Sequence, residues 1–539
     1  MSSFVSVAER IVDALLASNP AIASSAGDHR FDDRLPDYSP GSVAAEVAML
    51  RDAAGALAQV DADALDRQDQ VDHAILSARV DRLLFERTDL RDYEWDPLRH
   101  NPGPLLHDLI ARPFAPVPER LASLAGRLAA VPDALATARG TLRDMPRIHA
   151  ETAAGQFDGT AALVRDELPA LLAEAPALRG AIEPVAEAAI RALGGFADWL
   201  RAGLRDDAGP GRDPRLGRPL WEARLWHTLD TELTAGEVLQ RAERRLDQVT
   251  EEIRAAAVAL VGGPATDETV RRALDQLAVE HPDNESIVDL AELTLVEATD
   301  FVRTHDLVSL VDDPCVIQVM PEFARGVAVA YCYPPGPLET ADVPTFYCIA
   351  PTPAGWPAQR VESFYREYND HMIRNLTVHE AMPGHFLQLA HSRRFRGSTR
   401  ARSLGFSGPF TEGWAVYAEE LMAGLGFGGA LIRLQQLKMQ LRMTINAVLD
   451  QLTHCADLTE ADAMALLVGR GFQEEGEAAG KWRRALLTST QLSTYFVGYT
   501  EVASIAAARP VGTSPRDWHD AMLAHGSPPP RHLRTLLLG

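Results

Sequence analysis

Apolar residues recur three or four positions apart through most of this chain, and this spacing constrains its fold more than any other feature. Ala, Leu, Arg and Glu dominate these stretches, and Pro or Gly interrupts them. Such a period places apolar side chains along one face of an α-helix, which must then pack against a neighbour. The sequence therefore predicts a mainly α fold, with helices over, for example, 5–17, 120–135, 167–204, 235–261 and 432–452.

The length of the chain bears on the number of lobes. Its 539 residues exceed the roughly 250–300 at which single cores usually stop growing, so two lobes are expected. Repeated Gly, Pro and Asp between Asp206 and Arg218 predict a loop, which we take as the boundary. We therefore predict an N-terminal helical lobe over 1–205 and a catalytic helical lobe over 219–539.

Three short runs depart from the helical pattern. Residues 315–320, 327–333 and 346–350 are rich in β-branched and aromatic side chains and are separated by turns containing Pro or Gly. They predict a small β-sheet at about 315–350. The edge of this sheet could pair with an extended peptide, with Tyr347 as a substrate contact, or the sheet could brace neighbouring helices.

Charge and targeting features limit the partners. The formal net charge is −23, from 75 acidic and 52 basic residues, which argues against nucleic acid and anionic membranes as general partners. The first ten residues lack a basic n-region and a lipobox cysteine, and no apolar run reaches 18 residues. The four cysteines are scattered without C-x-x-C spacing. We predict a cytoplasmic protein with no membrane partner and no thiolate metal site.

One constellation indicates a chemistry. His379 and Glu380 are adjacent, His385 follows, and Glu412 comes 27 residues after it. Two imidazoles and a carboxylate that bind Zn²⁺ and leave a fourth position to water form a catalytic zinc site. Glu380 would then be the general base for attack of water on a carbonyl carbon. This pattern predicts amide hydrolysis.

The spacing of the two histidines is unusual. In H-E-x-x-H they lie at i and i+4 on one helix face, but here the second is at i+6 and Pro383 occupies i+4. At about 100° per residue, i+6 lies roughly 120° from the first histidine. We interpret Pro383-Gly384 as a bulge that returns His385 to the same side. The alternative is a helix that ends at Met382 and a surface histidine after it.

The segment around Glu412 strengthens the metal interpretation. It resembles the Asn-Glu-Gly-Phe-Ala segment that supplies the third ligand in zinc aminopeptidases. Glu419 lies two turns later on the same face. It is a candidate to support a metal ligand or to contact the substrate, or it is a solvated helix charge. Gln388 is a candidate to orient a metal ligand through a hydrogen bond, or it is an ordinary polar residue of a helix.

The chain as a whole resembles the bacterial domain-of-unknown-function family 885. The family patterns H-E-x-x-P-G-H-x-x-Q and E-G-W-A-x-Y are present at 379–388 and 412–417, and residues 27–36 and 518–523 resemble its N- and C-terminal signatures. The family is similar to zinc peptidases, including helical carboxypeptidases and oligopeptidases with a deep cleft. The resemblance therefore implies a two-lobed helical fold with a deep cleft and a small β-sheet beside the metal-binding helix. The chain departs from the family at His525-Gly526, where members often have Asn-Gly, and in lacking the features of the many exported lipoproteins.

The same resemblance implies an oxyanion donor. A late tyrosine has this role in the related helical peptidases, and Tyr495 stands where the family also has a tyrosine. Tyr499 is a candidate substrate contact, although either tyrosine could be a core aromatic. Arg531 could hold a substrate carboxylate, or it could belong to a tail of surface charges.

These observations predict a zinc-dependent metallohydrolase that cleaves amide or peptide bonds, as a carboxypeptidase or oligopeptidase of short peptides. One alternative keeps the metal but has a non-peptide amide or a biosynthetic intermediate as substrate. Another is a non-catalytic binding or scaffold protein with a structural metal, against which Glu380 argues because a structural site needs no base. The sequence makes no prediction about oligomeric state.

Overall fold

The chain forms two compact units, each assembled from separate stretches of sequence. The computed structural model describes residues 4–205, 211–320, 329–353 and 355–539. Unit 1 comprises Met1–Pro214, Pro335–Val343 and Gly397–Gly405, and unit 2 comprises Arg215–Pro334, Pro344–Arg396 and Phe406–Gly539. Two segments from the second half of the chain thus belong to the unit formed by its first 214 residues.

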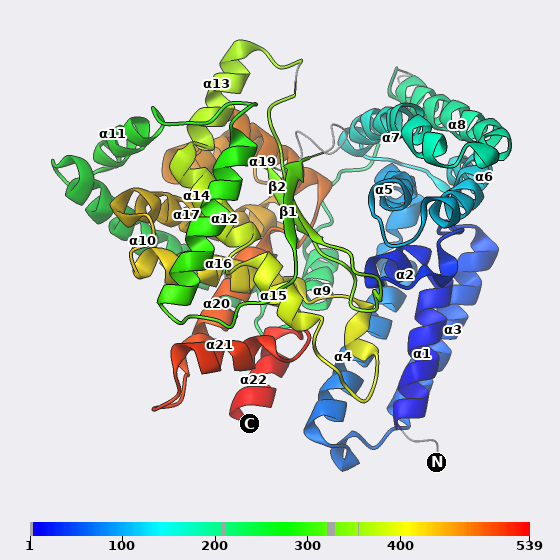
Figure 1. The fold of residues 1–539 in the computed structure, drawn as a ribbon, viewed down its shortest axis with the longest axis horizontal. Helices are drawn as coiled ribbons and strands as arrows, with labels where there is room; N and C mark the ends of the chain where they lie inside the picture. Colours follow the sequence, from blue (N-terminus) through cyan, green and yellow to red (C-terminus); the bar gives the residue numbers. More distant parts are fainter. Residues whose placement is uncertain (1–3, 206–210, 321–328, 354) are drawn as a thin grey trace. The chain divides into compact units, whose positions relative to one another are not determined.

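Unit 1 is helical, and its helices bury the apolar faces that the sequence pattern predicts. Phe4, Val7, Ile11 and Leu15 of the first helix, spaced at three and four, are all buried. They pack in one core with residues of the second, third and fourth helices and with the segment 397–405. The helices of unit 1 (Figure 1) are α1 (Phe4–Ser18), α2 (Pro20–Ala26), α3 (Pro40–Ala58), α4 (Arg67–Phe85), α5 (Gly103–Ala111), α6 (Val117–Thr141), α7 (Arg147–Glu174) and α8 (Arg179–Arg205).

The predicted helix over 167–204 is wrong, because the chain breaks there into α7 and α8. Ala175 leaves the helical conformation, with φ −135° and ψ 63°, directly before Pro176. A proline disfavours the α conformation in the residue before it and has no N–H to continue the ladder. By contrast, the helix predicted over 235–261 has those limits, and Thr234 and Glu237 form a capping box at its start.

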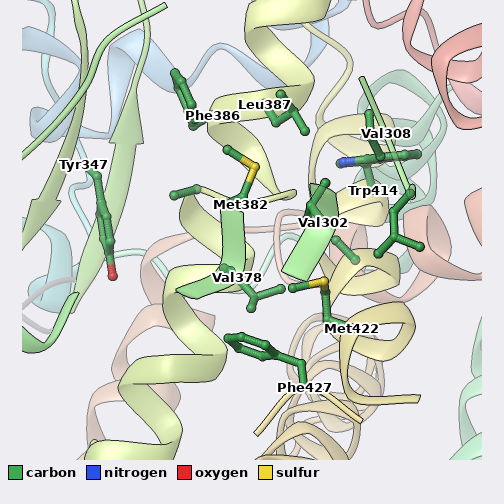
Figure 2. Packing of buried hydrophobic residues seen from close by; sticks show 14 of the residues in the cluster. Val302, Val308, Tyr347, Val378, Met382, Phe386, Leu387, Trp414, Met422 and Phe427 are labelled. Carbon is green, nitrogen blue, oxygen red and sulfur yellow. The ribbon is translucent and has the colours of Figure 1, made fainter. Parts of the chain in front are cut away.

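Unit 2 holds the remaining helices around two large apolar cores, of which one contains Trp414. Figure 2 shows part of this core, in which Val378, Met382 and Leu387 lie in one apolar cluster with Trp414 and Met422. The helices are α9 (Arg218–Leu229), α10 (Ala235–Val261), α11 (Asp267–Leu277), α12 (Ile287–Thr304), α13 (Ala358–Glu367), α14 (Asp370–Glu380), α15 (His385–Ser392), α16 (Gly408–Gly424), α17 (Gly429–Cys455), α18 (Glu460–Met464), α19 (Glu475–Leu487), α20 (Ser493–Ala507), α21 (Pro515–Leu523) and α22 (Pro530–Leu538).

Unit 2 also contains the predicted small sheet. Its strands are β1 (Cys315–Val319), β2 (Ala330–Tyr333) and β3 (Thr345–Ile349), in the order β1-β3-β2. The central strand β3 is parallel to β1 and antiparallel to β2. Residues 327 and 328 of the predicted second run lie outside the described residues, as do 206–210 of the predicted boundary loop.

The fold is therefore mainly α with one small three-stranded sheet, as the sequence predicts. The deep cleft stays a prediction. Among the described residues, no helix is both long enough and apolar enough to cross a membrane.

Candidate metal centre

The two motif histidines lie on different helices. Helix α14 ends at Glu380 and α15 begins at His385, so the interruption is a complete break rather than a bulge within one helix. The Met382–Pro383 peptide bond in the intervening turn is cis. The indole N–H of Trp414 donates to the carbonyl of Pro383 over 2.8 Å. This bond joins the turn to α16, the helix that carries Glu412.

A close backbone approach explains Gly384 in this turn. Its N–H donates to the carbonyl of Val378 over 3.0 Å. A Cβ atom at this position would lie 1.9 Å from the carbonyl oxygen of His379 and 2.3 Å from that of Val378. Only glycine can therefore make the turn that brings the start of α15 back onto the end of α14.

The three predicted ligands converge within unit 2. One ligand atom from each of His379, His385 and Glu412 lies within 4.8 Å of the others. Glu412 Oε2 is 3.4 Å from His379 Nε2 and 3.5 Å from His385 Nε2. These distances exceed those of charge-assisted hydrogen bonds, about 2.7–2.9 Å. They match the edge of about 3.3–3.4 Å of a tetrahedron whose bonds are about 2.0–2.1 Å, the lengths found for zinc.

A second carboxylate orients His379. Glu419 Oε1 lies 2.7 Å from His379 Nδ1, and the side-chain amide of Asn375 donates to Glu419 Oε2 over 2.6 Å. Glu419 is 1% exposed, and both of its oxygens have these protein partners. Such a carboxylate fixes the tautomer and direction of a ligating imidazole. The structure thus places Glu419 behind a predicted ligand, where a substrate does not reach it.

The electrostatics of the cluster favour an added positive charge. Burial would raise the pKa of Glu412, but the adjacent His379 and His385 hold it well below its usual range. Burial would lower the pKa of His379, but Glu412 and Glu419 outweigh this effect and raise it. Carboxylates on both sides of the imidazole therefore stabilise a cation at this position.

Glu380 lies at the end of α14 beside the ligands and is 6% exposed. Burial raises its pKa more than the neighbouring His385 and His379 lower it. A backbone hydrogen bond from Cys332 of the edge strand β2 also reaches its carboxylate. A carboxylate whose pKa is raised toward neutrality is better suited to accept and return a proton at physiological pH.

The helices α16 and α20 approach each other closely beside Glu412. A Cβ atom on Gly413 would lie 2.3 Å from the carbonyl carbon of Gly498, and one on Gly498 would lie 2.0 Å from the carbonyl oxygen of Pro409. Glycine at both positions therefore permits the contact. Tyr495 lies one turn before Gly498, so this contact holds its helix against the one that carries Glu412.

The two predicted tyrosines of α20 have different partners. The hydroxyl of Tyr495 is 3.3 Å from Arg484 Nη2 and 3.5 Å from Gln491 Nε2. The hydroxyl of Tyr499 donates to Glu420 over 2.6 Å. Tyr499 thus has a carboxylate partner inside the protein, whereas Tyr495 is held by donors only.

The other predicted site residues have structural partners. The amide of Gln388 donates to the hydroxyl of Ser527. The guanidinium of Arg531 pairs with Asp230 at 2.5 Å. Neither contact involves the three converging ligand atoms.

Tyr347 lies in the central strand β3 and is fully buried, with its hydroxyl 3.2 Å from that of Thr377 on α14. Together with the bond from Cys332 to Glu380, this contact makes the sheet a brace for the metal-binding helix. Pairing of its edge with a substrate stays a prediction.

Two residues at the site were missed from the sequence. Asn375 lies one turn before His379 on the same helix face, and this i, i+4 spacing was an available signal. Arg484 comes from α19, 72 positions after Glu412 (484 − 412), and no local pattern indicates it.

Comparison with known proteins identifies relatives of the whole chain. The family described as "Bacterial protein of unknown function (DUF885)" matches residues 20–537. The solved structure of a "putative lipoprotein of unknown function" from Shewanella oneidensis is 27% identical, with a TM-score of 0.82 and 100% of both chains covered. That of the "putative lipoprotein" from Colwellia psychrerythraea is 16% identical, with a TM-score of 0.78, and covers 99% of this chain and 98% of the other. No curated protein matches the chain.

These relatives contradict the prediction of a cytoplasmic protein. Both solved structures are described as lipoproteins, and one of them is alignable over the full length of both chains. The prediction depended on the absence of a leader and a lipobox cysteine in the first ten residues. A few terminal residues say less about location than a relationship that spans the folded chain.

Proposed function

The chain belongs to the DUF885 family, and from that premise we propose that it is a zinc-dependent metallohydrolase of the metallopeptidase kind that cleaves amide bonds in short peptides. The observation that carries this proposal is the position of Glu412 Oε2, 3.4 Å and 3.5 Å from the Nε2 atoms of two imidazoles. Imidazole and carboxylate together are a donor set that suits zinc.

The residues present fit such an ion. Among the described residues, no group makes a hydrogen bond to the buried Glu412 Oε2. A buried, ionised oxygen without a hydrogen-bond partner is costly unless a cation completes its environment. His379, His385 and Glu412 would hold the ion, and when bound it would supply Lewis-acid activation of water and of the scissile carbonyl.

The protein's own groups supply the remaining requirements of hydrolysis. Glu380 accepts the proton of the attacking water and returns it to the leaving amine, for which its raised pKa is suited. Glu419 and Asn375 keep His379 in one tautomer and direction. The hydroxyl of Tyr495, adjacent to the guanidinium of Arg484, can donate to the oxygen that becomes negative during attack.

The proposal is tested with zinc-loaded protein and a set of unmodified and N-acetylated di- and tripeptides, together with simple aryl amides. Mass spectrometry of the products gives the bond cleaved. We expect cleavage of peptides by the wild type and nearly none by Glu380→Gln at equal zinc content. Cleavage of aryl amides alone would move the substrate class to non-peptide amides. No cleavage of any compound by a zinc-loaded protein would contradict hydrolysis.

A further inference from the structure

Basic side chains of α17 and α19 gather around Glu477. Arg442 of α17 pairs with Glu477 and lies 3.0 Å from the hydroxyl of Tyr368. Lys481 of α19 is 5% exposed, with its amine 3.9 Å from the same Glu477. Arg442 and Lys481 thus share this carboxylate, and Glu367 also lies 3.9 Å from Arg442. Burial holds the pKa of Lys481 well below its usual range, which leaves Arg442 as the firm cation of the two.

Arg484, one turn after Lys481, has no carboxylate partner among the described residues. Its Nη2 atom donates to the side-chain oxygen of Gln491 over 2.7 Å and lies 3.3 Å from the hydroxyl of Tyr495. These are neutral groups, so no carboxylate is in direct contact with this half-buried guanidinium. Its Nε and Nη1 atoms form no hydrogen bond within the described part of the chain and remain for a ligand.

Two observations connect Arg484 with the metal centre. Tyr495, which it contacts, lies one turn before Gly498, the point where α20 touches α16 beside Glu412. Burial lowers the pKa of Arg484, but the influence of Tyr495 and Glu412 outweighs it and the pKa is raised. The negative charge of Glu412 therefore reaches the guanidinium.

The geometry points to Arg484 as the anchor for the free α-carboxylate of the substrate, which makes the enzyme a carboxypeptidase. This inference rests on the proposed function and narrows it to peptides with an ionised C-terminus. An arginine presents parallel N–H donors that match the two oxygens of a carboxylate. Tyr495 and Gln491 hold one side of the fork in place, and the partner-free side can receive the anion. Arg531, the arginine expected from the sequence in this role, is engaged with Asp230.

Binding to the zinc-loaded Glu380→Gln protein tests this inference without turnover. Isothermal calorimetry measures three N-acetylated dipeptides that differ at the end: a glycine free acid, its amide, and an aspartate amide that carries only a side-chain carboxylate. We expect the glycine acid to bind on the order of 10²-fold more tightly than either amide, the range for loss of one partner of a desolvated charge pair.

A second substitution in the same background identifies the anchor. Arg484→Gln should weaken binding of the acid on the order of 10²-fold and leave both amides within about 2-fold. Arg484→Lys keeps the charge but not the two parallel donors, so its affinity for the acid should lie between those of the parent and of Arg484→Gln. Arg483→Gln, on the exposed neighbouring arginine, is the matched control and should bind as the parent does.

Several results would overturn the anchor. These are equal binding of acid and amide, no binding of the acid, equal binding of the aspartate amide and the acid, or an equal loss for acid and amide in Arg484→Gln. The last result would make Arg484 a residue that only positions Tyr495. If the wild type hydrolyses acids and amides equally well, the proposed function stands but the role of Arg484 as anchor is excluded. If the protein binds acids through Arg484 but hydrolyses no compound, the anchor stands and the proposed function is excluded.

Discussion

Each unit of this protein places a histidine between two carboxylates, and the two arrangements differ in what their distances permit. In unit 1, the ring nitrogens of His29 lie 2.7 Å from Asp32 and 2.9 Å from Glu339. In unit 2, His379 has one such short contact, 2.7 Å to Glu419, and one longer contact, 3.4 Å to Glu412.

The longer distance between His379 and Glu412 distinguishes a set of metal ligands from a hydrogen-bonded ion pair. Both ring nitrogens of His29 have a carboxylate oxygen at hydrogen-bonding distance, so the ring is a cation. It joins the segment 335–343 to the N-terminal part of unit 1. In unit 2, the longer distance is repeated at His385, 3.5 Å from the same oxygen. A second imidazole and space between the donors, rather than the residue types, favour a metal.

The largest expected effect concerns catalysis in unit 2. Glu380→Gln should keep zinc but lower kcat by about 10² to 10⁴, because the proton acceptor is gone while the ligands are unchanged. The matched change in unit 1, Glu339→Gln, should leave kcat within about 2-fold, since no catalytic role falls on that cluster. Steady-state kinetics on a cleaved peptide measure both variants. A fully active Glu380→Gln enzyme would exclude water activation by this residue.

Removal of the Tyr495 hydroxyl is expected to have the next largest effect. Tyr495→Phe should lower kcat by about 10² to 10³ with unchanged zinc content, the usual loss for one oxyanion donor. Tyr499→Phe is the control on the same helix, because its hydroxyl is bonded to Glu420. If both variants lose the same activity, the effect comes from packing of α20 and not from oxyanion stabilisation.

Glu419 should affect the metal more weakly than the ligands do. Glu419→Gln leaves His379 in place but removes the charged acceptor at Nδ1, and the expected loss of zinc affinity is about 10- to 100-fold. Competition with a fluorescent chelator measures this loss. The counterpart in unit 1, Asp32→Asn, should leave zinc affinity unchanged. An unaltered affinity in Glu419→Gln would mean that His379 needs no orienting carboxylate.

The His29 cluster should make the free energy of unfolding depend on pH, an effect smaller than those above. Burial lowers the pKa of His29, but the bonds to Asp32 and Glu339 outweigh it and raise the pKa to about 9 from 6.5. The stabilisation is therefore complete below about pH 6.5 and is lost as pH rises through about 9. After a discount for a ring that is 32% exposed, it amounts to about 1 to 2 kcal/mol.

This prediction is checked by thermal unfolding of wild type and His29→Gln at pH 6.5 and pH 10. The difference between the two proteins should be largest at pH 6.5 and should nearly vanish at pH 10. A difference that grows toward pH 10 would mean that His29 is neutral in the folded protein.

The parts of the site that follow from local geometry could be predicted from the sequence. Pro383 and the i+6 position of His385 require that the helix be distorted if both rings are to face one ion, although the predicted bulge is in fact a complete break between two helices. The small sheet and the helix over 235–261 likewise follow from local composition and capping. The predicted helix over 167–204 is too long because the apolar spacing continues through Pro176, although this proline ends α7.

The parts that depend on distant residues could not be predicted. Glu339, one of the two partners of His29, is 310 positions away from it, and Arg531 meets Asp230 across 301 positions (531 − 230). Helical phase places Glu419 on the same face as Glu412, but only the packing of α14 against α16 makes it the partner of His379. Such pairings are set by tertiary contacts, on which a single sequence carries no local signal.

The metal content of the purified protein tests the central claim most directly. Elemental analysis of the wild type should find about one zinc per chain. His379→Ala and Glu412→Ala should each reduce zinc to near zero, whereas His29→Ala should keep the wild-type content. Equal metal content in all four proteins, or loss of zinc in His29→Ala alone, would contradict the assignment of the metal to His379, His385 and Glu412.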